Sequence, residues 1–306
     1  MSDFSTLAGN ATKITARGFG WTHAGRTQPA LADIDLVIEP GERVLLCGDS
    51  GSGKSTLLAA MAGVLGSDEE GTRTGELLLE DSTGLVEEPG RSIPVGLVLQ
   101  DPDSQVISAR VGDDIAFGCE NLAYPREEIW RRVAAAKELV GPFVPLDFPT
   151  ERLSGGQKQR LALAGVIAMG AGVVLLDEPT ANLDPEGARD VVRAVSALVE
   201  ETGATLVVVE HQHAAWKGVL ERAVELDHGR IVSDGPFAEV AQRRQVAGLP
   251  QARRMGEAEL AEREAALWST DLVTRYGPPR TVALPAGAST VITGPNGAGK
   301  STWLMT

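Results

Sequence analysis

Short apolar runs alternate with longer amphipathic stretches over most of the chain. The runs at 44–47, 173–176 and 206–209 are typical of strands buried on both faces of a parallel sheet. Between the last two runs, Pro185 begins a helical pattern that ends at Gly203. Alternation of this kind predicts an α/β fold with a parallel sheet whose two faces are covered.

The hydrophobic pattern in the rest of the chain predicts further strands and helices. Short strands with turns are expected in 12–48, and polar and apolar positions alternate in 71–99. Helices are expected at 57–65, across the helical region 111–141, where Pro125 suits a first turn, and from Gly156 to Met169.

Composition and charge narrow the class of protein. Apolar residues make up 43% of the chain, but no run approaches the roughly 18 residues that a membrane-spanning helix needs. The N-terminus lacks a basic, apolar signal, so we expect a soluble protein made in the cytosol. The net charge of −14 repels phosphate backbones and argues against nucleic acid as a partner. Cys47 and Cys119 are expected to be reduced thiols.

The pattern G-x-x-x-x-G-K-[ST], which describes a phosphate-binding loop, occurs twice. In such loops the glycines let backbone N–H groups point at phosphates from a helix N-terminus. Lys54 would add a charge at the β and γ phosphates of ATP, and the Ser55 hydroxyl would ligate Mg²⁺. A purely structural glycine-rich turn is the alternative. The nucleotide-binding residues predicted in the first copy are Gly48, Asp49, Ser50, Gly51, Ser52, Gly53, Lys54, Ser55 and Thr56.

Two acidic residues follow the apolar strand 173–176. Asp177 is placed to hold the Mg²⁺ shell, and Glu178 would emerge at the carboxyl end of the sheet, where ligands of open α/β folds bind. A carboxylate there can orient and polarise the attacking water, so Glu178 is the predicted catalytic residue. The alternative is an acidic pair that caps a helix before Pro179.

The segment Leu153–Gln157 reads LSGGQ and resembles the signature of ATP-binding cassette (ABC) proteins. The resemblance implies a P-loop NTPase fold with a mostly parallel core sheet, an antiparallel β-subdomain and an α-helical subdomain at about 104–160. It implies that two cassettes act head to tail. Ser154, Gly155, Gly156 and Gln157 would then face the nucleotide held by the partner cassette.

Further positions match the family in order. Gln100 looks like the Q-loop glutamine, a catalytic residue that contacts Mg²⁺ and responds to the membrane partner. Asp184 looks like part of the D-loop at the dimer interface, and His211 like the switch histidine that contacts the γ-phosphate. Trp21 stands where the family places an aromatic residue on adenine, a role for which Phe19 competes.

A finer resemblance lies in 100–105, 111–118 and 120–122, which are similar to the ATPase subunits of energy-coupling-factor importers for vitamins and metal ions. The resemblance implies an ATP-hydrolysing subunit on the cytoplasmic face of the cell membrane. A transmembrane coupling protein would dock near Gln100–Asn121. The alternatives are a soluble tandem cassette that acts on ribosomes, and a chain that hydrolyses nothing until it self-associates or meets another cassette.

The second phosphate loop is Gly294–Ser301. It is not followed by a Q-loop glutamine, a signature, an acidic pair after an apolar strand, a D-loop or a switch histidine. We therefore expect a complete cassette in 1–240, a charged linker in 241–268 and the truncated, catalytically dead start of a second cassette in 269–306. The partner cassette would be a second copy, a different chain, or the missing half of a tandem protein.

Overall fold

The structure is a computed structural model that describes residues 7, 11–66, 70–141, 144–181, 183–211, 213–247, 264–272 and 280–287. Two compact units are present: Met1–Leu183 with Gly187–Val246, and Asp184–Glu186 with Ala247–Thr306. The predicted second phosphate loop, 294–301, lies outside the described residues.

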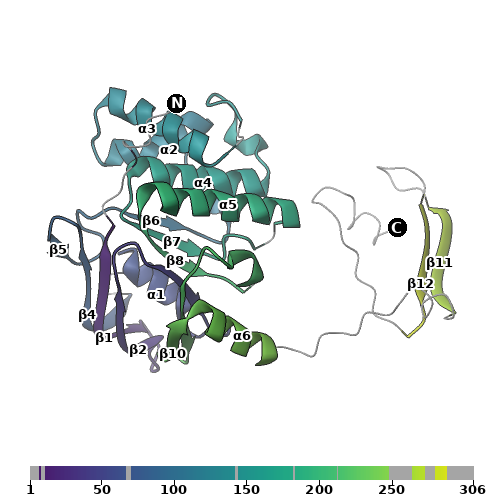
Figure 1. Ribbon diagram of the computed structural model, residues 1–306, viewed down its shortest axis with the longest axis horizontal. Coiled ribbons are helices and arrows are strands. Elements are labelled where there is room, and N and C mark those ends of the chain that lie inside the picture. Colours follow the sequence, from purple (N-terminus) through teal and green to yellow (C-terminus); the bar gives the residue numbers. More distant parts are fainter. Residues whose placement is uncertain are drawn as a thin grey trace. The chain divides into compact units, whose positions relative to one another are not determined.

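A mostly parallel six-stranded sheet forms the centre of the first unit, as the apolar runs predicted (Figure 1). Its order is β10-β9-β3-β8-β7-β6, and only the β10–β9 pair is antiparallel. The strands are β3 (Arg43–Cys47), β6 (Val95–Val98), β7 (Val173–Asp177), β8 (Thr205–Val209), β9 (Arg222–Asp227) and β10 (Arg230–Pro236).

A second, four-stranded sheet is antiparallel throughout, with the order β2-β1-β4-β5. Its strands are β1 (Lys13–His23), β2 (Leu31–Ile38), β4 (Gly71–Glu80) and β5 (Val86–Glu87). This sheet confirms the expected antiparallel β-subdomain.

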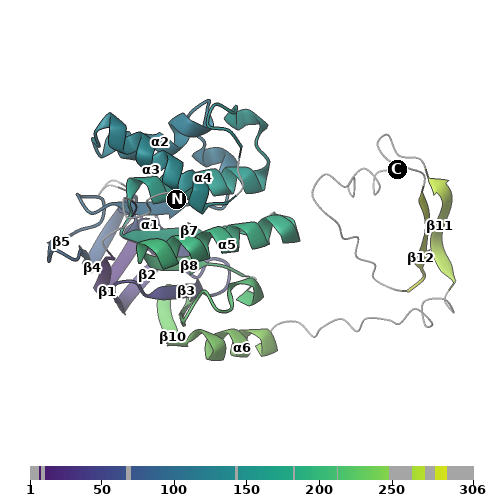
Figure 2. The same ribbon diagram turned by 45° about the horizontal axis from the view of Figure 1, so that its top comes forward.

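Side chains that alternate along the central strands face two separate cores. Val44 and Leu46 of β3 pack with the four-stranded sheet and helix α1 (Lys54–Met61), whereas Leu45 and Cys47 pack on the opposite face, among the other helices. Because successive strand residues point to opposite faces, a fully apolar run is required where both faces are covered. Figure 2 shows α4 and α5 over one face of the sheet.

The remaining helices are α2 (Val111–Asn121), α3 (Arg126–Leu139), α4 (Gly155–Met169), α5 (Pro185–Thr202) and α6 (Phe237–Ala247), with a short 3₁₀ helix, η2, at Pro102–Gln105. The predicted helical region 111–141 is therefore two helices. The chain turns between them at Ala123, whose φ of 55° is left-handed, and Pro125 precedes α3 in an extended conformation. The first helix also ends earlier than predicted, because Gly63 turns the chain with a φ of 71°.

The second unit contains an antiparallel pair, β11 (Ala265–Leu272) with β12 (Arg280–Pro285). Among the described residues, no helix has the length and apolar character needed to span a membrane.

Candidate functional site

The first phosphate loop connects the end of β3 to the start of α1, as its sequence predicted. Gly48 has a φ of 146°, and a Cβ there would lie 2.2 Å from the Leu226 carbonyl oxygen. The Lys54 ammonium donates to the carbonyl oxygens of Gly48 and Asp49 at 2.9 and 2.8 Å. The lysine therefore lies over the loop, close to where the phosphates of a nucleotide would meet the helix N-terminus.

Ser55 and Asp177, the two predicted Mg²⁺ ligands from separate elements, meet at this loop. The Ser55 hydroxyl lies close enough to the Asp177 carboxylate to influence its pKa. Burial raises the pKa of Asp177 above its usual value, although the Ser55 hydroxyl opposes that rise. A hydroxyl beside a half-buried carboxylate fits Mg²⁺, which prefers hard oxygen ligands.

Glu178 lies at the centre of the residues predicted to act on the γ-phosphate. Its Oε2 atom accepts a hydrogen bond from the Gln100 side-chain amide at 3.1 Å, and its Oε1 atom lies 3.0 Å from His211 Nε2. The three residues come from the ends of β6, β7 and β8, neighbouring strands of one sheet. Parallel strands bring their carboxyl ends to one edge, and ligands of α/β folds bind at that edge.

The backbone of Glu178 is left-handed, with a φ of 48°. Such a conformation is uncommon outside glycine and persists only where neighbouring contacts hold it. Its N–H donates to the Val209 carbonyl at 2.9 Å, and its own carbonyl accepts the Ala181 N–H at 3.0 Å. The sharp turn aims the carboxylate at Gln100 and His211 rather than along the strand.

The predicted signature segment opens α4. Ser154 caps this helix, and its side chain and that of Gln157 exchange hydrogen bonds with each other's backbone N–H at 3.4 and 2.9 Å. A Cβ on Gly155 or Gly156 would lie 3.8–3.9 Å from the Leu183 side chain, so the signature adjoins the start of the predicted D-loop. Ser154 and Gly155 are exposed. Asp184 is described, whereas Asn182 before it is not.

Trp21 does not present a face to a nucleotide, which contradicts its predicted role. Its ring is 4% exposed in the core between α1 and the four-stranded sheet, and Phe19, the competing residue, is 1% exposed. A buried ring leaves no surface on which a base can stack. The prediction depended on the place of Trp21 in the family order, which does not say whether the aromatic ring at that position is buried.

His23 is an exposed aromatic side chain beside Trp21 that the sequence reasoning did not consider for contact with the base. It is exposed at the end of β1, on the same face as Trp21, whose indole N–H donates to its Nδ1 at 3.1 Å. The two rings meet edge to face with centroids 6.0 Å apart. Ala30 places this end of β1 beside the phosphate loop: its N–H bonds Trp21, and its carbonyl would lie 2.7 Å from a Cβ on Gly53. The sequence does contain a sign of this position. His23 is two residues beyond Trp21, and residues two apart in a strand lie on the same face, so His23 continues the face of Trp21 past the end of the core.

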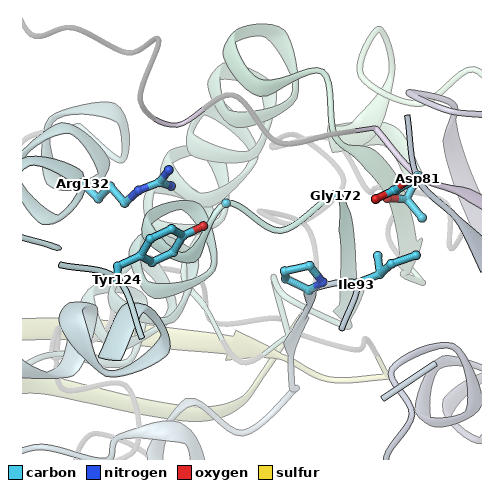
Figure 3. A pocket seen from close by; sticks show the side chains of 8 residues that line it. Asp81, Ile93, Tyr124, Arg132 and Gly172 are labelled. Carbon is cyan, nitrogen blue, oxygen red and sulfur yellow. The ribbon is translucent and has the colours of Figure 1, made fainter. Parts of the chain in front are cut away.

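A separate cavity of about 180 Å³ contains none of the predicted site residues (Figure 3). Both charged side chains that line it already have partners within the protein. Asp81 accepts hydrogen bonds within its own turn, whereas Arg132 pairs with Glu128 and lies 4.3 Å from the Tyr124 ring centroid. The cavity also borders Gly172, which precedes β7, so it lies at the amino end of a strand whose carboxyl end carries Glu178.

The chain is similar to known proteins in sequence and fold. Residues 31–181 match the family model described as ABC transporter. The chain is 40% identical to an energy-coupling factor transporter ATP-binding protein EcfA1 of Caldanaerobacter subterraneus subsp. tengcongensis, covering 70% of this chain and 76% of that protein. A putative ABC transporter ATP-binding protein of Methanosarcina acetivorans is 39% identical over 74% of this chain.

A solved structure of cbiO1 from Clostridium perfringens, described as part of the ABC transporter complex cbiONQ, has a TM-score of 0.65 and 30% identity. It covers 78% of this chain, which in turn covers 93% of it. The chain spans only 35% and 41% of the length of the two Methanosarcina relatives, from M. acetivorans and M. mazei.

Proposed function

Because the chain belongs to the ABC transporter family of ATP-binding proteins, we propose that it binds and hydrolyses ATP to energise a membrane importer of the energy-coupling-factor type. The observation that carries this proposal is the position of Glu178. Its carboxylate contacts Gln100 and His211 at the same sheet edge that carries Lys54, Ser55 and Asp177.

In this proposal the phosphate loop binds the β and γ phosphates through backbone N–H groups and Lys54. Ser55 and Asp177, with Gln100, would hold Mg²⁺, which supplies charge neutralisation on the phosphate oxygens. Glu178 orients the attacking water and accepts its proton, because its carboxylate is anchored from two sides. His211 contacts the γ-phosphate.

Hydrolysis also requires a second cassette, which would be a copy of this chain, another chain, or the second half of a tandem protein. Ser154 to Gln157 would complete the partner's nucleotide site, because an exposed helix N-terminus attracts phosphate. Asp184 would lie at the same interface. We assign the catalytic cassette to 1–240 and the start of a second cassette to 269–306.

A transmembrane coupling protein is the proposed membrane partner, docked near Gln100–Asn121. Exposed apolar side chains support this location: Ile107 is 59% exposed and Phe117 is 37% exposed, in a segment that also carries the Q-loop glutamine. The chain would then act at the cytoplasmic face of the membrane. Relatives named for energy-coupling-factor transport and for HMP/thiamine import favour a vitamin or metal-ion cargo.

The test combines turnover with partner capture. We expect Mg²⁺-dependent ATP hydrolysis by the purified chain, and co-purification of a detergent-solubilised membrane protein when the chain is tagged in its native host. Substitution of Ile107 and Phe117 by serine should abolish capture but leave ATP binding unchanged. Recovery of ribosomes in place of a membrane protein would support the tandem cassette that acts in translation.

A further inference from the structure

A buried carboxylate, Glu210, connects the two segments that carry Glu178 and His211. Its side chain is 4% exposed. One carboxylate oxygen accepts the hydroxyl of Thr180, and the other accepts the backbone N–H of His211 at 2.8 Å. Thr180 belongs to the turn after β7, and it is also buried, at 7% exposed.

We propose that Glu210 is a positioning residue for ATP hydrolysis, which fixes the Glu178 turn and the His211 backbone in one arrangement. This inference rests on the proposed function, because it assigns Glu210 a task within the same site. Glu210 would not touch the nucleotide. It acts through its hydrogen bonds to the Thr180 hydroxyl and the His211 backbone N–H.

The strand register explains why such a connection is needed. Asp177 of β7 pairs with Val209 of β8, and the Glu178 N–H still bonds the Val209 carbonyl at 2.9 Å. One residue further, both chains leave the sheet, so ladder hydrogen bonds no longer set their separation. Glu210 bridges the two chains at this point with hydrogen bonds from its side chain.

The conformation of Glu178 gives the bridge a specific role. Because a left-handed φ at a non-glycine residue persists only where surrounding contacts maintain it, the turn from Glu178 to Thr180 requires an anchor. The Thr180 hydroxyl, bonded to Glu210, provides one beneath the turn. The same carboxylate holds the His211 backbone, and this sets the 3.0 Å contact between His211 Nε2 and Glu178 Oε1.

Enzyme kinetics distinguish positioning from simple stability. We expect Glu210→Ala and Thr180→Val each to lower kcat by about 10- to 100-fold, the loss associated with a hydrogen bond to a charged group. The KM for ATP should change little, because the phosphate loop is untouched. The double variant should lose no more than the worse single variant, since both remove the same bridge.

Matched variants control for the loss of a buried hydroxyl. Thr205→Val removes a buried threonine hydroxyl at the other end of β8, where it donates to the Thr12 carbonyl at 2.6 Å. It should lower the unfolding temperature without lowering kcat. Thr180→Ser and Glu210→Gln keep groups that can form the bridge, so both should retain most of the wild-type kcat. Equal kcat in Thr180→Val and Thr205→Val would overturn the proposal.

A second measurement does not depend on turnover. The chain has four histidines, so a sample with ¹³C-labelled histidine rings gives four ring signals, one of which is assigned to His211 with a His211→Ala variant. Glu210→Ala and Thr180→Val should move the His211 signal, whereas Thr205→Val should not. An unmoved signal overturns the positioning role. A moved signal in a chain without ATPase activity supports the positioning of His211 and counts against the proposed function alone.

Discussion

The side-chain amide of Gln100 donates a hydrogen bond to Glu178 Oε2 at 3.1 Å, although 78 residues separate the two in the sequence. The contact joins the segment proposed to face the membrane partner to the carboxylate proposed to activate water. His211 contacts the other oxygen of the same carboxylate. A movement of the Gln100 segment would therefore change the position of Glu178, so under the proposed function this contact would connect the proposed membrane partner to hydrolysis.

Replacing Glu178 by glutamine tests the assigned catalytic base. We expect Glu178→Gln to bind Mg²⁺-ATP with unchanged affinity and to lose about 10²- to 10⁴-fold in kcat, because an amide cannot accept the proton of the attacking water. Calorimetry and phosphate release measure the two quantities. Glu201→Gln, an exposed position on α5, is the matched control. Undiminished hydrolysis by Glu178→Gln would refute the assignment.

If exposed His23 contacts adenine in place of buried Trp21, substitutions at the two residues should affect different properties, ATP affinity at His23 and stability at Trp21. His23→Ala should weaken ATP binding by about 5- to 100-fold, the range for loss of one stacked base, and leave binding of inorganic tripolyphosphate unchanged. His23→Phe should retain the ATP affinity. Trp21→Ala should instead lower the unfolding free energy by about 3–5 kcal/mol through a core cavity. A selective loss of ATP affinity in folded Trp21→Ala would return the adenine contact to the tryptophan.

The exposed signature predicts complementation between inactive variants. Ser154→Ala and Lys54→Ala should each be inactive alone, and the first should also lose about 1 kcal/mol through its helix cap. A mixture should recover part of the activity, because one composite site then has both Lys54 and Ser154. Specific activity of the wild type should rise with protein concentration. Activity that is independent of concentration and unrestored by mixing would contradict a site shared between two copies.

Asp114 predicts a pH effect on stability. Its carboxylate is 9% exposed and accepts the N–H groups of Ile107 and Ser108, both at 2.8 Å, and burial raises its pKa above the usual value despite these bonds. A raised folded-state pKa contributes stability below the unfolded pKa, and that stability is lost as pH rises through the folded pKa. Asp114→Asn keeps an acceptor oxygen for both bonds and removes the titration.

We therefore expect the unfolding free energy of wild type, relative to Asp114→Asn, to fall as pH rises through the mildly acidic range. Urea unfolding at a series of pH values measures the difference. Asp113→Asn, at the exposed neighbouring position, should track the wild type. A wild-type advantage that grows with pH would show that the sign is wrong.

Arg222 predicts a stability difference between arginine and lysine. Its guanidinium forms a bidentate pair with Asp234 at 2.6 Å for both bonds, contacts Glu42 at 3.0 Å and donates to the Val37 carbonyl at 2.9 Å. The bonds to Asp234, followed by those to Glu42, raise the pKa of Arg222 above its usual value. Lysine keeps the charge but loses the planar fork, so Arg222→Lys should cost about 1–3 kcal/mol of unfolding free energy.

The control for that change is Arg230→Lys, because Arg230 and Asp33 form an exposed pair with side chains 58% and 72% accessible. Its cost should be about 0–1 kcal/mol. If Arg222→Lys and Arg230→Lys lower the unfolding free energy equally, the bidentate geometry of the Arg222 guanidinium adds no stability beyond that of an exposed ion pair.

Much of the fold was predictable because local patterns and tertiary requirements agree. The apolar runs in β3, β7 and β8 are buried on both faces, α5 begins at Pro185 as predicted, and α4 begins at Gly155, one residue before the predicted Gly156. Pro125 was expected in the first turn of a helix and does precede α3, but the left-handed turn at Ala123 between α2 and α3 was not expected, because no glycine marks it.

The sequence by itself determined the chemistry: a phosphate loop, two acidic residues after a buried strand, and a glutamine, a signature and a histidine in family order. Those features are local, since each depends on residues adjacent in the chain. Only the tertiary structure decided which side chains meet. Sheet order places Gln100, Glu178 and His211 in contact, burial removes Trp21 from the nucleotide surface, and the register of β7 with β8 brings Glu210 beneath the catalytic turn. Contacts of this kind join residues distant in the chain, so no local pattern could specify them.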